Sequence, residues 1–312
     1  MFEAVRAHLP EHVATVVSVA PEMSKGVIPR VRSTLAARRA RGDVHHVTGD
    51  TTFMGLLLPR RQTVLTVHDC EFLDRASWLK GLVYRVLWLQ LPCLRATVVT
   101  VVSPATADHL IRSIWVAPKD LRIVPDPLPD GFEASPAPQN DPPVVLQIGT
   151  RPNKGLPAVV RAVEGTGWRL RTVGVLDDGQ RALLADSDVP HEGLRDLTQA
   201  QVAEAYAGSD VLVVASSREG FGMHVVEAQA CARPVVVADR EPLPWVAGPG
   251  GAVKVDPTDP ESIRDGIATA LFDAPVRDGL VAAGLANVHR FDADRVAQAY
   301  AAIYDEVAAR LR

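Results

Sequence analysis

The chain has 312 residues, of which 47% are hydrophobic and 22% charged, and its formal net charge at pH 7 is -4. This composition is that of a soluble globular protein, and it argues against a nucleic-acid partner because nucleic-acid binders usually carry a basic excess. The three cysteines are far apart and lack C-x-x-C spacing, which argues against a disulfide framework and a structural zinc site. The apolar run at 13–20 is too short, and starts too late, for a signal peptide or a membrane span, so we expect a cytoplasmic protein.

Short runs of β-branched residues alternate with longer helical patterns along the chain. The predicted strands cover 13–19, 44–47, 63–67, 97–102, 144–148, 170–175, 210–214, 234–238 and 252–255. The predicted helices cover 31–41, 105–113, 156–164, 199–207, 225–231 and 260–271. Nearly continuous apolar strands, such as residues 98–102, are typical of parallel sheets that helices cover on both faces. The alternation therefore predicts a parallel α/β fold.

A proline-rich stretch from Val124 to Pro143 interrupts this pattern. Proline stiffens a chain and cannot join a central ladder, so we interpret the stretch as a linker between two domains, 1–130 and 140–290. Apolar residues at helical spacing after Asp294 predict a C-terminal helix, which we place at 291–312 and expect to pack back towards the N-terminal domain. Two doubly wound domains would face a cleft, with ligands outside the carboxyl ends of their strands.

The most informative segment follows the predicted strand 210–214. Gly220 and Gly222 flank Phe221, so the backbone can turn sharply there and approach a ligand closely. A helix is predicted to begin near His224, and its free N–H groups would attract an anion such as a phosphate.

Two glutamates accompany this turn. Glu227, expected in the first turn of the helix, could accept hydrogen bonds from the vicinal hydroxyls of a ribose, and Glu219 could bind sugar hydroxyls. The alternative is that Glu227 only complements the helix dipole and that Glu219 is a solvated loop residue.

A second segment, Gly149 to Gly155, follows the predicted strand 144–148 and contains Arg151 and Lys154. Two cations and two glycines at a strand-to-helix turn suit a diphosphate, although an ordinary turn with a solvated lysine would look the same. Because both segments follow strands in the second half of the chain, together they favour a nucleotide-diphosphate site.

Glu219 and Glu227 with the residues between them resemble the E-x7-E motif of family 4 glycosyltransferases. Residues 228–236, 243–248 and 255–257 resemble its continuation, and 149–155 resembles the phosphate-binding turn of the family. In the first half the resemblance rests on 45–50 and 66–69.

The resemblance implies a GT-B fold of two Rossmann-like domains and a retaining transfer of a sugar from a nucleotide-diphosphate donor, with neither a metal ion nor a cofactor. It implies that Glu227 holds the ribose and Glu219 the donor sugar. It further implies that Arg151 and Lys154 neutralise the diphosphate. The remaining donor-site residues that it implies are Gly149, Gly220, Phe221, Gly222, Met223 and His224. The acceptor would be a saccharide, a lipid-linked saccharide or a small metabolite.

In the first half, His68 resembles the active-site histidine of the family, which contacts the donor sugar, while a structural histidine at a strand end is the alternative. The resemblance makes Asp69, with His68 and Glu219, a catalytic candidate. Gly49 and Asp50 are candidates for acceptor binding.

Two positions depart from the family pattern: His224 replaces a common proline, and Trp245 replaces a common glutamate. The family also begins with a strand and a glycine-rich loop, whereas residues 1–6 here already look like the following helix. We therefore expect the first strand and loop to be missing from this chain.

Weaker signals leave alternatives open. The D-x-D strings at 186–188 and 292–294 do not follow apolar strands, which argues against a metal role. The arginine-rich helix at 30–41 could contact anionic lipid at the inner membrane face or an acidic acceptor, or it could form a solvated face. The apolar helix at 79–91 could be an acceptor-side helix or a membrane-surface element, or it could pack in the core. A nucleotide-sugar epimerase or hydrolase, or a catalytically silent nucleotide-sugar binder, remains an alternative function.

Overall fold

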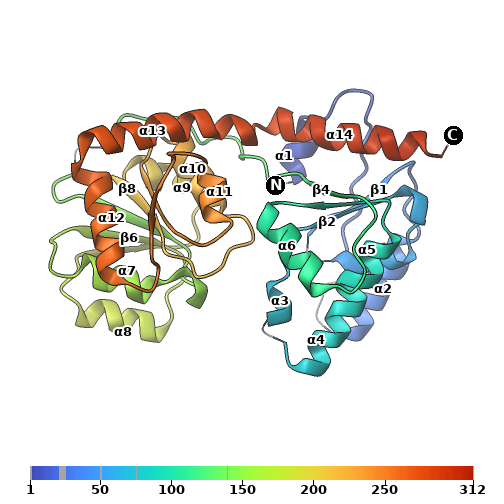
Figure 1. Cartoon of the computed structure of the whole chain (residues 1–312), viewed down its shortest axis with the longest axis horizontal. Helices are drawn as coiled ribbons and strands as arrows, with labels where there is room; N and C mark the ends of the chain where they lie inside the picture. The colour runs from blue at the N-terminus through green and yellow to red at the C-terminus, as the bar shows by residue number, and fades with distance from the viewer. Residues whose placement is uncertain (1, 21–25, 50, 75, 139, 312) are drawn as a thin grey trace. The chain divides into compact units, whose positions relative to one another are not determined.

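The computed structural model describes residues 2–20, 26–49, 51–74, 76–138 and 140–311 (Figure 1). The chain forms two compact units. One consists of residues 1–127 together with 293–312, and the other of residues 128–292. Both units contain parallel sheets, so the predicted α/β class is confirmed.

The first unit is built on a four-stranded parallel sheet. Its strands are ordered β1 (His45–Val47), β2 (Thr63–Val67), β3 (Val98–Val101) and β4 (Leu121–Ile123). All residues of β2 and β3 are buried, as their mostly β-branched sequences predict. Its helices are α1 (Phe2–Ala7), α2 (Val27–Ala37), α3 (Glu71–Asp74), α4 (Trp78–Tyr84), α5 (Leu91–Arg95), α6 (Pro104–Ser113) and α14 (Ala293–Ala309), with 3-10 turns at Thr52–Leu57 and Arg60–Gln62 and a π-helical segment at Arg85–Gln90.

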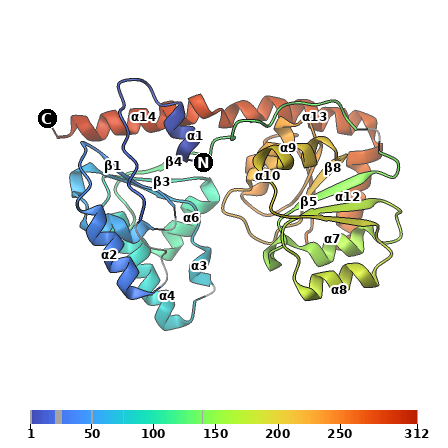
Figure 2. The same cartoon turned by 180° about the vertical axis from the view of Figure 1, so that it is seen from behind.

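The C-terminal helix α14 completes the core of this first unit. Its apolar face packs with Val5 of α1 and with Val64 and Val98 of the sheet, and α1 and α14 lie side by side in both views (Figures 1 and 2). Beneath it, His46 is held at 2.7 Å from both the Tyr304 hydroxyl and Thr66 Oγ1. The predicted tail helix is therefore confirmed, from Ala293 to Ala309.

The second unit has a six-stranded parallel sheet. Its order is β7 (His191–Leu194), β6 (Arg169–Val173), β5 (Val144–Ile148), β8 (Val211–Val214), β9 (Val235–Ala238) and β10 (Val253–Val255). Counted along the unit, this is the order 3-2-1-4-5-6 of a dinucleotide-binding fold, and the order reverses between β5 and β8. Its helices are α7 (Leu156–Val163), α8 (Asp178–Asp186), α9 (Gln199–Ala207), α10 (Met223–Ala230), α11 (Leu243–Ala247), α12 (Pro260–Phe272) and α13 (Ala274–Val288), with 3-10 turns at Pro152–Lys154 and His289–Phe291.

The boundary between the units lies between Pro127 and Leu128, so most of the proline-rich stretch belongs to the second unit. The buried Arg233 explains this attachment. Its guanidinium donates hydrogen bonds to the backbone carbonyls of Ser135 (2.6 Å) and Pro136 (2.7 Å). The stretch is therefore fastened to its own unit rather than being a free linker.

Several sequence predictions were wrong. The predicted strand at 13–19 is irregular, and Val16 is 91% exposed because the segment pairs with no strand. The predicted apolar helix 79–91 is divided among α4, the π-helical segment and α5. Strands β4 and β7 were not predicted, since both lie at sheet edges and lack a buried apolar run. In the part of the chain that the structure describes, no helix is long and apolar enough to cross a membrane.

Candidate functional site

The site predicted in the second unit forms where its sheet order reverses. β5 and β8 are neighbours in the sheet, so the loops after their carboxyl ends, 149–155 and 215–222, lie together. Backbone contacts join the loops: the amide of Ser217 donates to the Asn153 carbonyl at 2.8 Å, and the Asn153 side-chain amide donates to the Arg218 carbonyl at 3.1 Å. The two segments that sequence reasoning singled out separately are therefore one structural feature.

Glycine is required at the closest approach of these loops. Gly155 has φ +73°, and a Cβ there would fall less than 3.0 Å from the carbonyl oxygen of Ala215. At Gly149, with φ +88°, a Cβ would lie 2.9 Å from Cε of Lys154. The absence of side chains at these two positions lets the loops meet and lets Lys154 fold back over the turn.

Three charged or titratable side chains converge in this space. Lys154 Nζ lies 2.5 Å from Glu219 Oε1 and 2.8 Å from His224 Nε2. All three are largely buried, with side chains 12%, 11% and 20% exposed respectively. His224 Nε2 also lies 3.7 Å from Glu219 Oε1, so this carboxylate faces both basic side chains.

The carboxylate of Glu219 is held ionised. Burial acts to raise its pKa, but the hydrogen bonds and charges of His224 and Lys154 outweigh burial and lower the pKa to about 2. Glu219 therefore accepts hydrogen bonds at neutral pH and has no proton to give. This charge state fits a group that binds sugar hydroxyls.

Glu227 lies in the second turn of α10, not the first, so that prediction was wrong. Its Oε2 accepts a 2.7 Å hydrogen bond from the hydroxyl of Tyr206 on α9. Burial, reinforced by the charge of Glu227, raises the pKa of Tyr206 well above its usual range, so this hydroxyl remains a donor. Tyr206 therefore holds one oxygen of this carboxylate in place. Sequence reasoning missed Tyr206 because it occupies an ordinary apolar position of a helix.

The other donor-site predictions divide by exposure. Arg151 is exposed at the rim of the turn, and Met223 is half-buried at the start of α10. Phe221 is 5% exposed, and its ring packs edge-on against Phe291 and Trp245. Phe221 thus supports the Gly220–Gly222 turn from inside.

In the first unit, the predicted residues lie at the carboxyl ends of the strands. His68 follows β2, and its Nδ1 lies 3.5 Å from Oδ1 of the buried Asp126, which follows β4. The opposite ring nitrogen, Nε2, is buried without a hydrogen-bond partner among the described residues. Asp126 carried no sequence signal because it lies inside the proline-rich stretch.

The candidate acceptor residues have different surroundings. Asp69 Oδ1 accepts a hydrogen bond from the backbone amide of Glu71, which is the first residue of the short helix α3. Gly49 has φ +75° and open space around its Cα. Asp50 lies outside the described residues. Within the described ranges, no group of three or more His, Cys, Asp or Glu could hold a metal ion.

A parallel sheet with this strand order, with glycine turns and a buried lysine where the order reverses, defines a Rossmann-like ligand-binding unit. Comparison with known protein families identifies the family. The family model described as "Glycosyl transferases group 1" matches residues 132–285, and the one described as "Glycosyltransferase Family 4" matches residues 2–129. The chain belongs to the family 4 glycosyltransferases and has the GT-B fold, as the E-x7-E resemblance predicted.

Curated relatives agree with this family. The D-inositol 3-phosphate glycosyltransferase of Segniliparus rotundus is 34% identical over 143 residues, which cover 45% of this chain and 31% of the relative. O-antigen chain mannosyltransferase B of Escherichia coli is 38% identical over 126 residues, covering 40% and 29%. The MMP alpha-(1->4)-mannosyltransferase of Mycolicibacterium hassiacum is 28% identical over 274 residues, covering 79% and 66%. The matched segments thus span less than a third of the first two relatives.

Solved structures share the fold. Sucrose-phosphate synthase from Thermosynechococcus elongatus superposes with a TM-score of 0.75 at 21% identity, covering 90% of this chain and 79% of that one. HepE of Anabaena, solved in complex with UDP and glucose, gives a TM-score of 0.71 at 18% identity, covering 89% and 81%.

Proposed function

We propose that the chain is a retaining glycosyltransferase that moves a sugar from a nucleotide-diphosphate donor to a hydroxyl group of an acceptor, without a metal ion. The observation that carries this proposal is the cluster of Lys154, Glu219 and His224 at the reversal of the second sheet. It places a cation for a diphosphate beside an ionised acceptor for sugar hydroxyls. Family membership and the UDP complexes of HepE support a nucleotide-sugar donor.

The donor would bind through groups at both strand ends. Lys154 and the exposed Arg151 would neutralise the diphosphate, with help from the amides of Gly149, of the Gly220–Gly222 turn and of the N-terminus of α10. Fixed cations and amide dipoles of this kind can stabilise a departing diphosphate. Glu227, oriented by Tyr206, would accept both ribose hydroxyls through its carboxylate.

The transfer would occur on one face of the sugar. The bond from the anomeric carbon to the diphosphate oxygen breaks, an acceptor oxygen bonds to the same face, and the departing phosphate takes the acceptor proton. Glu219 would hold sugar hydroxyls during this step. His68 would contact the donor sugar: with Nδ1 facing Asp126, its unpartnered Nε2 can accept a hydroxyl hydrogen.

The acceptor is proposed only by class: a saccharide, a lipid-linked saccharide or a small metabolite. Asp69 or Asp50, with Gly49, would orient its hydroxyl. Exposed apolar side chains on α4, including Trp78 (77% exposed) and Leu79 (57%), favour peripheral contact of a cytoplasmic enzyme with a membrane that carries the acceptor.

The test combines donor binding with product analysis. A panel of nucleotide-sugars is screened by thermal shift, and the labelled donor that binds is incubated with candidate acceptors. Transfer of label to an acceptor supports the proposal. Released sugar alone would indicate a hydrolase, an isomerised donor an epimerase, and binding without turnover a silent binder.

A matched pair of variants links the outcome to the cluster. Lys154→Gln removes the buried cation, whereas Lys254→Gln removes a lysine of the same unit that is 57% exposed, on β10. Donor affinity should fall at least tenfold in the first variant and stay unchanged in the second. Equal affinities in both variants would reject the cluster as the diphosphate site.

A further inference from the structure

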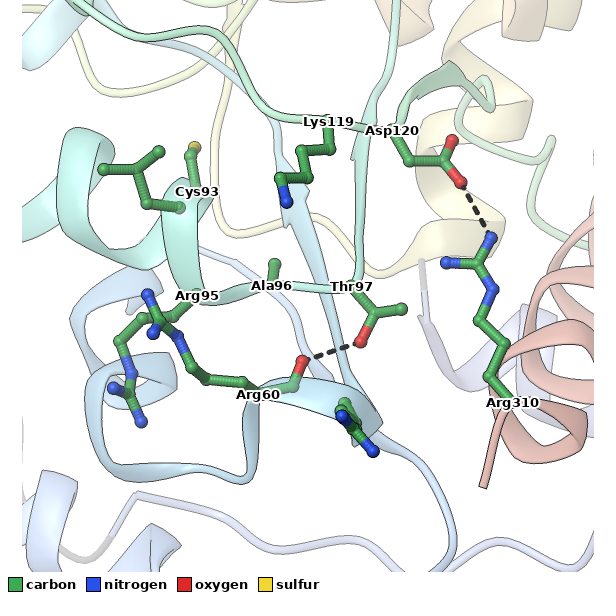
Figure 3. Close-up of a pocket in the computed structure, with 10 residues that line it drawn as sticks. Arg60, Cys93, Arg95, Ala96, Thr97, Lys119, Asp120 and Arg310 are labelled. Atoms are coloured by element: carbon green, nitrogen blue, oxygen red, sulfur yellow. Dashed lines mark hydrogen bonds and ion pairs between the residues drawn. The ribbon is translucent and has the colours of Figure 1, made fainter. Parts of the chain in front are cut away.

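A cationic hollow opens in the first unit at the amino ends of its strands, whereas His68 follows the carboxyl end of β2. Its volume is about 760 Å³, and the residues that line it precede β2, β3 and β4 or follow α14. Figure 3 shows Lys119 between Arg60 and Arg95 on one side and Asp120 and Arg310 on the other. The residues that line the hollow are Arg60, Arg61, Cys93, Leu94, Arg95, Ala96, Thr97, Lys119, Asp120 and Arg310.

Most of the positive charge in this hollow is not neutralised from within the unit; of the cations that line it, Arg310 is paired, with Asp120 and Glu306. Its one carboxylate, Asp120, is already engaged by Arg122 at 2.7 Å and by Arg310 at 3.4 Å. Among the residues that the structure describes, Arg60, Arg61 and Lys119 have no ion-pair partner. The chain as a whole is acidic, so these cations do not reflect a general basic excess.

Arg95 adds an unsatisfied donor. One terminal guanidinium nitrogen donates to the Leu58 carbonyl at 3.1 Å, while its Nε is buried without a hydrogen-bond partner in the described structure. A buried donor without an acceptor is costly, so this group favours a ligand that supplies one. The cations around the hollow also repel one another, and an anion bound between them would offset that repulsion.

The side chains that line the hollow indicate which class of anion would bind there. Arginine forks and a lysine ammonium match phosphate oxygens, and several cations favour a ligand with more than one negative charge. Leu94 and Ala96 add an apolar wall for an organic group, and the volume is that of a small-molecule site. We propose that this hollow binds a phosphate ester or phosphoanhydride bearing two or more negative charges, separately from the proposed donor site.

The proposal is tested by calorimetric titration of the whole chain with tripolyphosphate at constant ionic strength. Wild-type protein should show binding at two sites, because the Lys154 cluster also favours a polyphosphate. The double variant Arg60→Gln/Lys119→Gln should lose one site by at least tenfold in affinity, and Lys154→Gln should lose the other. Both residues of the double variant are exposed, so the fold should persist, which circular dichroism checks.

A charge-matched control is the double variant Arg38→Gln/Arg39→Gln, since these exposed arginines lie at the end of α2 and outside the hollow. Unchanged binding in Arg60→Gln/Lys119→Gln, or an equal loss in the control, overturns the proposal. The site that Lys154→Gln removes bears only on the proposed donor site, not on the hollow.

A second arm identifies the source of the phosphate. Phosphatidylcholine vesicles with and without phosphatidylglycerol are sedimented with each variant. Binding to the anionic vesicles that is lost in Arg60→Gln/Lys119→Gln indicates a lipid headgroup. If vesicles do not bind in this way while the tripolyphosphate site is lost, the source is a soluble phosphate.

Discussion

The close approach of two loops in the second unit predicts an unequal effect of the same substitution at two glycines. Gly155 and Gly165 both have φ +73°, so alanine at either position must adopt a left-handed backbone that costs about 1 kcal/mol. A Cβ at Gly165 would meet no atom within 4 Å, whereas one at Gly155 would fall less than 3.0 Å from the Ala215 carbonyl oxygen. Overpacking of this kind adds about 1–3 kcal/mol.

We therefore expect Gly165→Ala to lower the free energy of unfolding of the second unit by about 1 kcal/mol and Gly155→Ala by about 2–4 kcal/mol. Native-state hydrogen exchange of the β5 and β8 amides measures this free energy for that unit alone. Because the clash would separate the loop of Lys154 from the loop of Glu219, donor affinity should also fall about tenfold in Gly155→Ala only. Equal stability and affinity in the two variants would refute the reasoning.

Three further predictions concern charged groups. Glu227→Gln should weaken nucleotide binding about ten- to a hundredfold and Tyr206→Phe by less, which titration calorimetry would show; an unchanged affinity in Glu227→Gln would remove it from the ribose site. Glu219→Gln should lower turnover while nucleoside diphosphate binds as tightly as before or tighter, and wild-type turnover would reject its role. Burial and then the charge of His68 lower the pKa of His46 to about 3, so stability is retained above pH 6.5 and lost as the pH falls towards 3. Between pH 7 and pH 5 the first unit should lose about 2 kcal/mol through His46, and His46→Gln should abolish that part of the loss in urea titrations.

Much of the fold was predictable because its central strands are buried on both faces. β2, β3, β8 and β9 appear in the sequence as short runs composed mostly of β-branched residues, and the structure confirms each. The same criterion failed at 13–19, where an apolar run lies exposed, and at the edge strand β7, whose residues are largely exposed. An apolar run becomes a buried strand only where a neighbouring strand and helices cover it, and the chain topology decides where such neighbours exist.

The candidate site was predictable where chemistry is written in consecutive residues. The turns at 149–155 and 219–227 could be found from glycines and charges that follow apolar strands. Tyr206 and Asp126 could not, because each acts through a contact made across the fold with Glu227 or His68. Glu227 lies in the second turn rather than the first because α10 begins at Met223, one residue before the predicted start, and the sequence does not fix that boundary.

The ion pair at the site bears on how a donor would be selected. Without a ligand, the charge of Lys154 is already neutralised by Glu219 at 2.5 Å. A diphosphate must therefore compete with that carboxylate for the lysine. A nucleotide-sugar can compensate, since its sugar hydroxyls supply hydrogen-bond donors to Glu219 as the phosphate engages Lys154. A nucleoside diphosphate without a sugar cannot, and it leaves Glu219 facing added negative charge. The same carboxylate would therefore favour the intact donor over the product, which explains why its neutralisation in Glu219→Gln is expected to strengthen product binding while turnover falls.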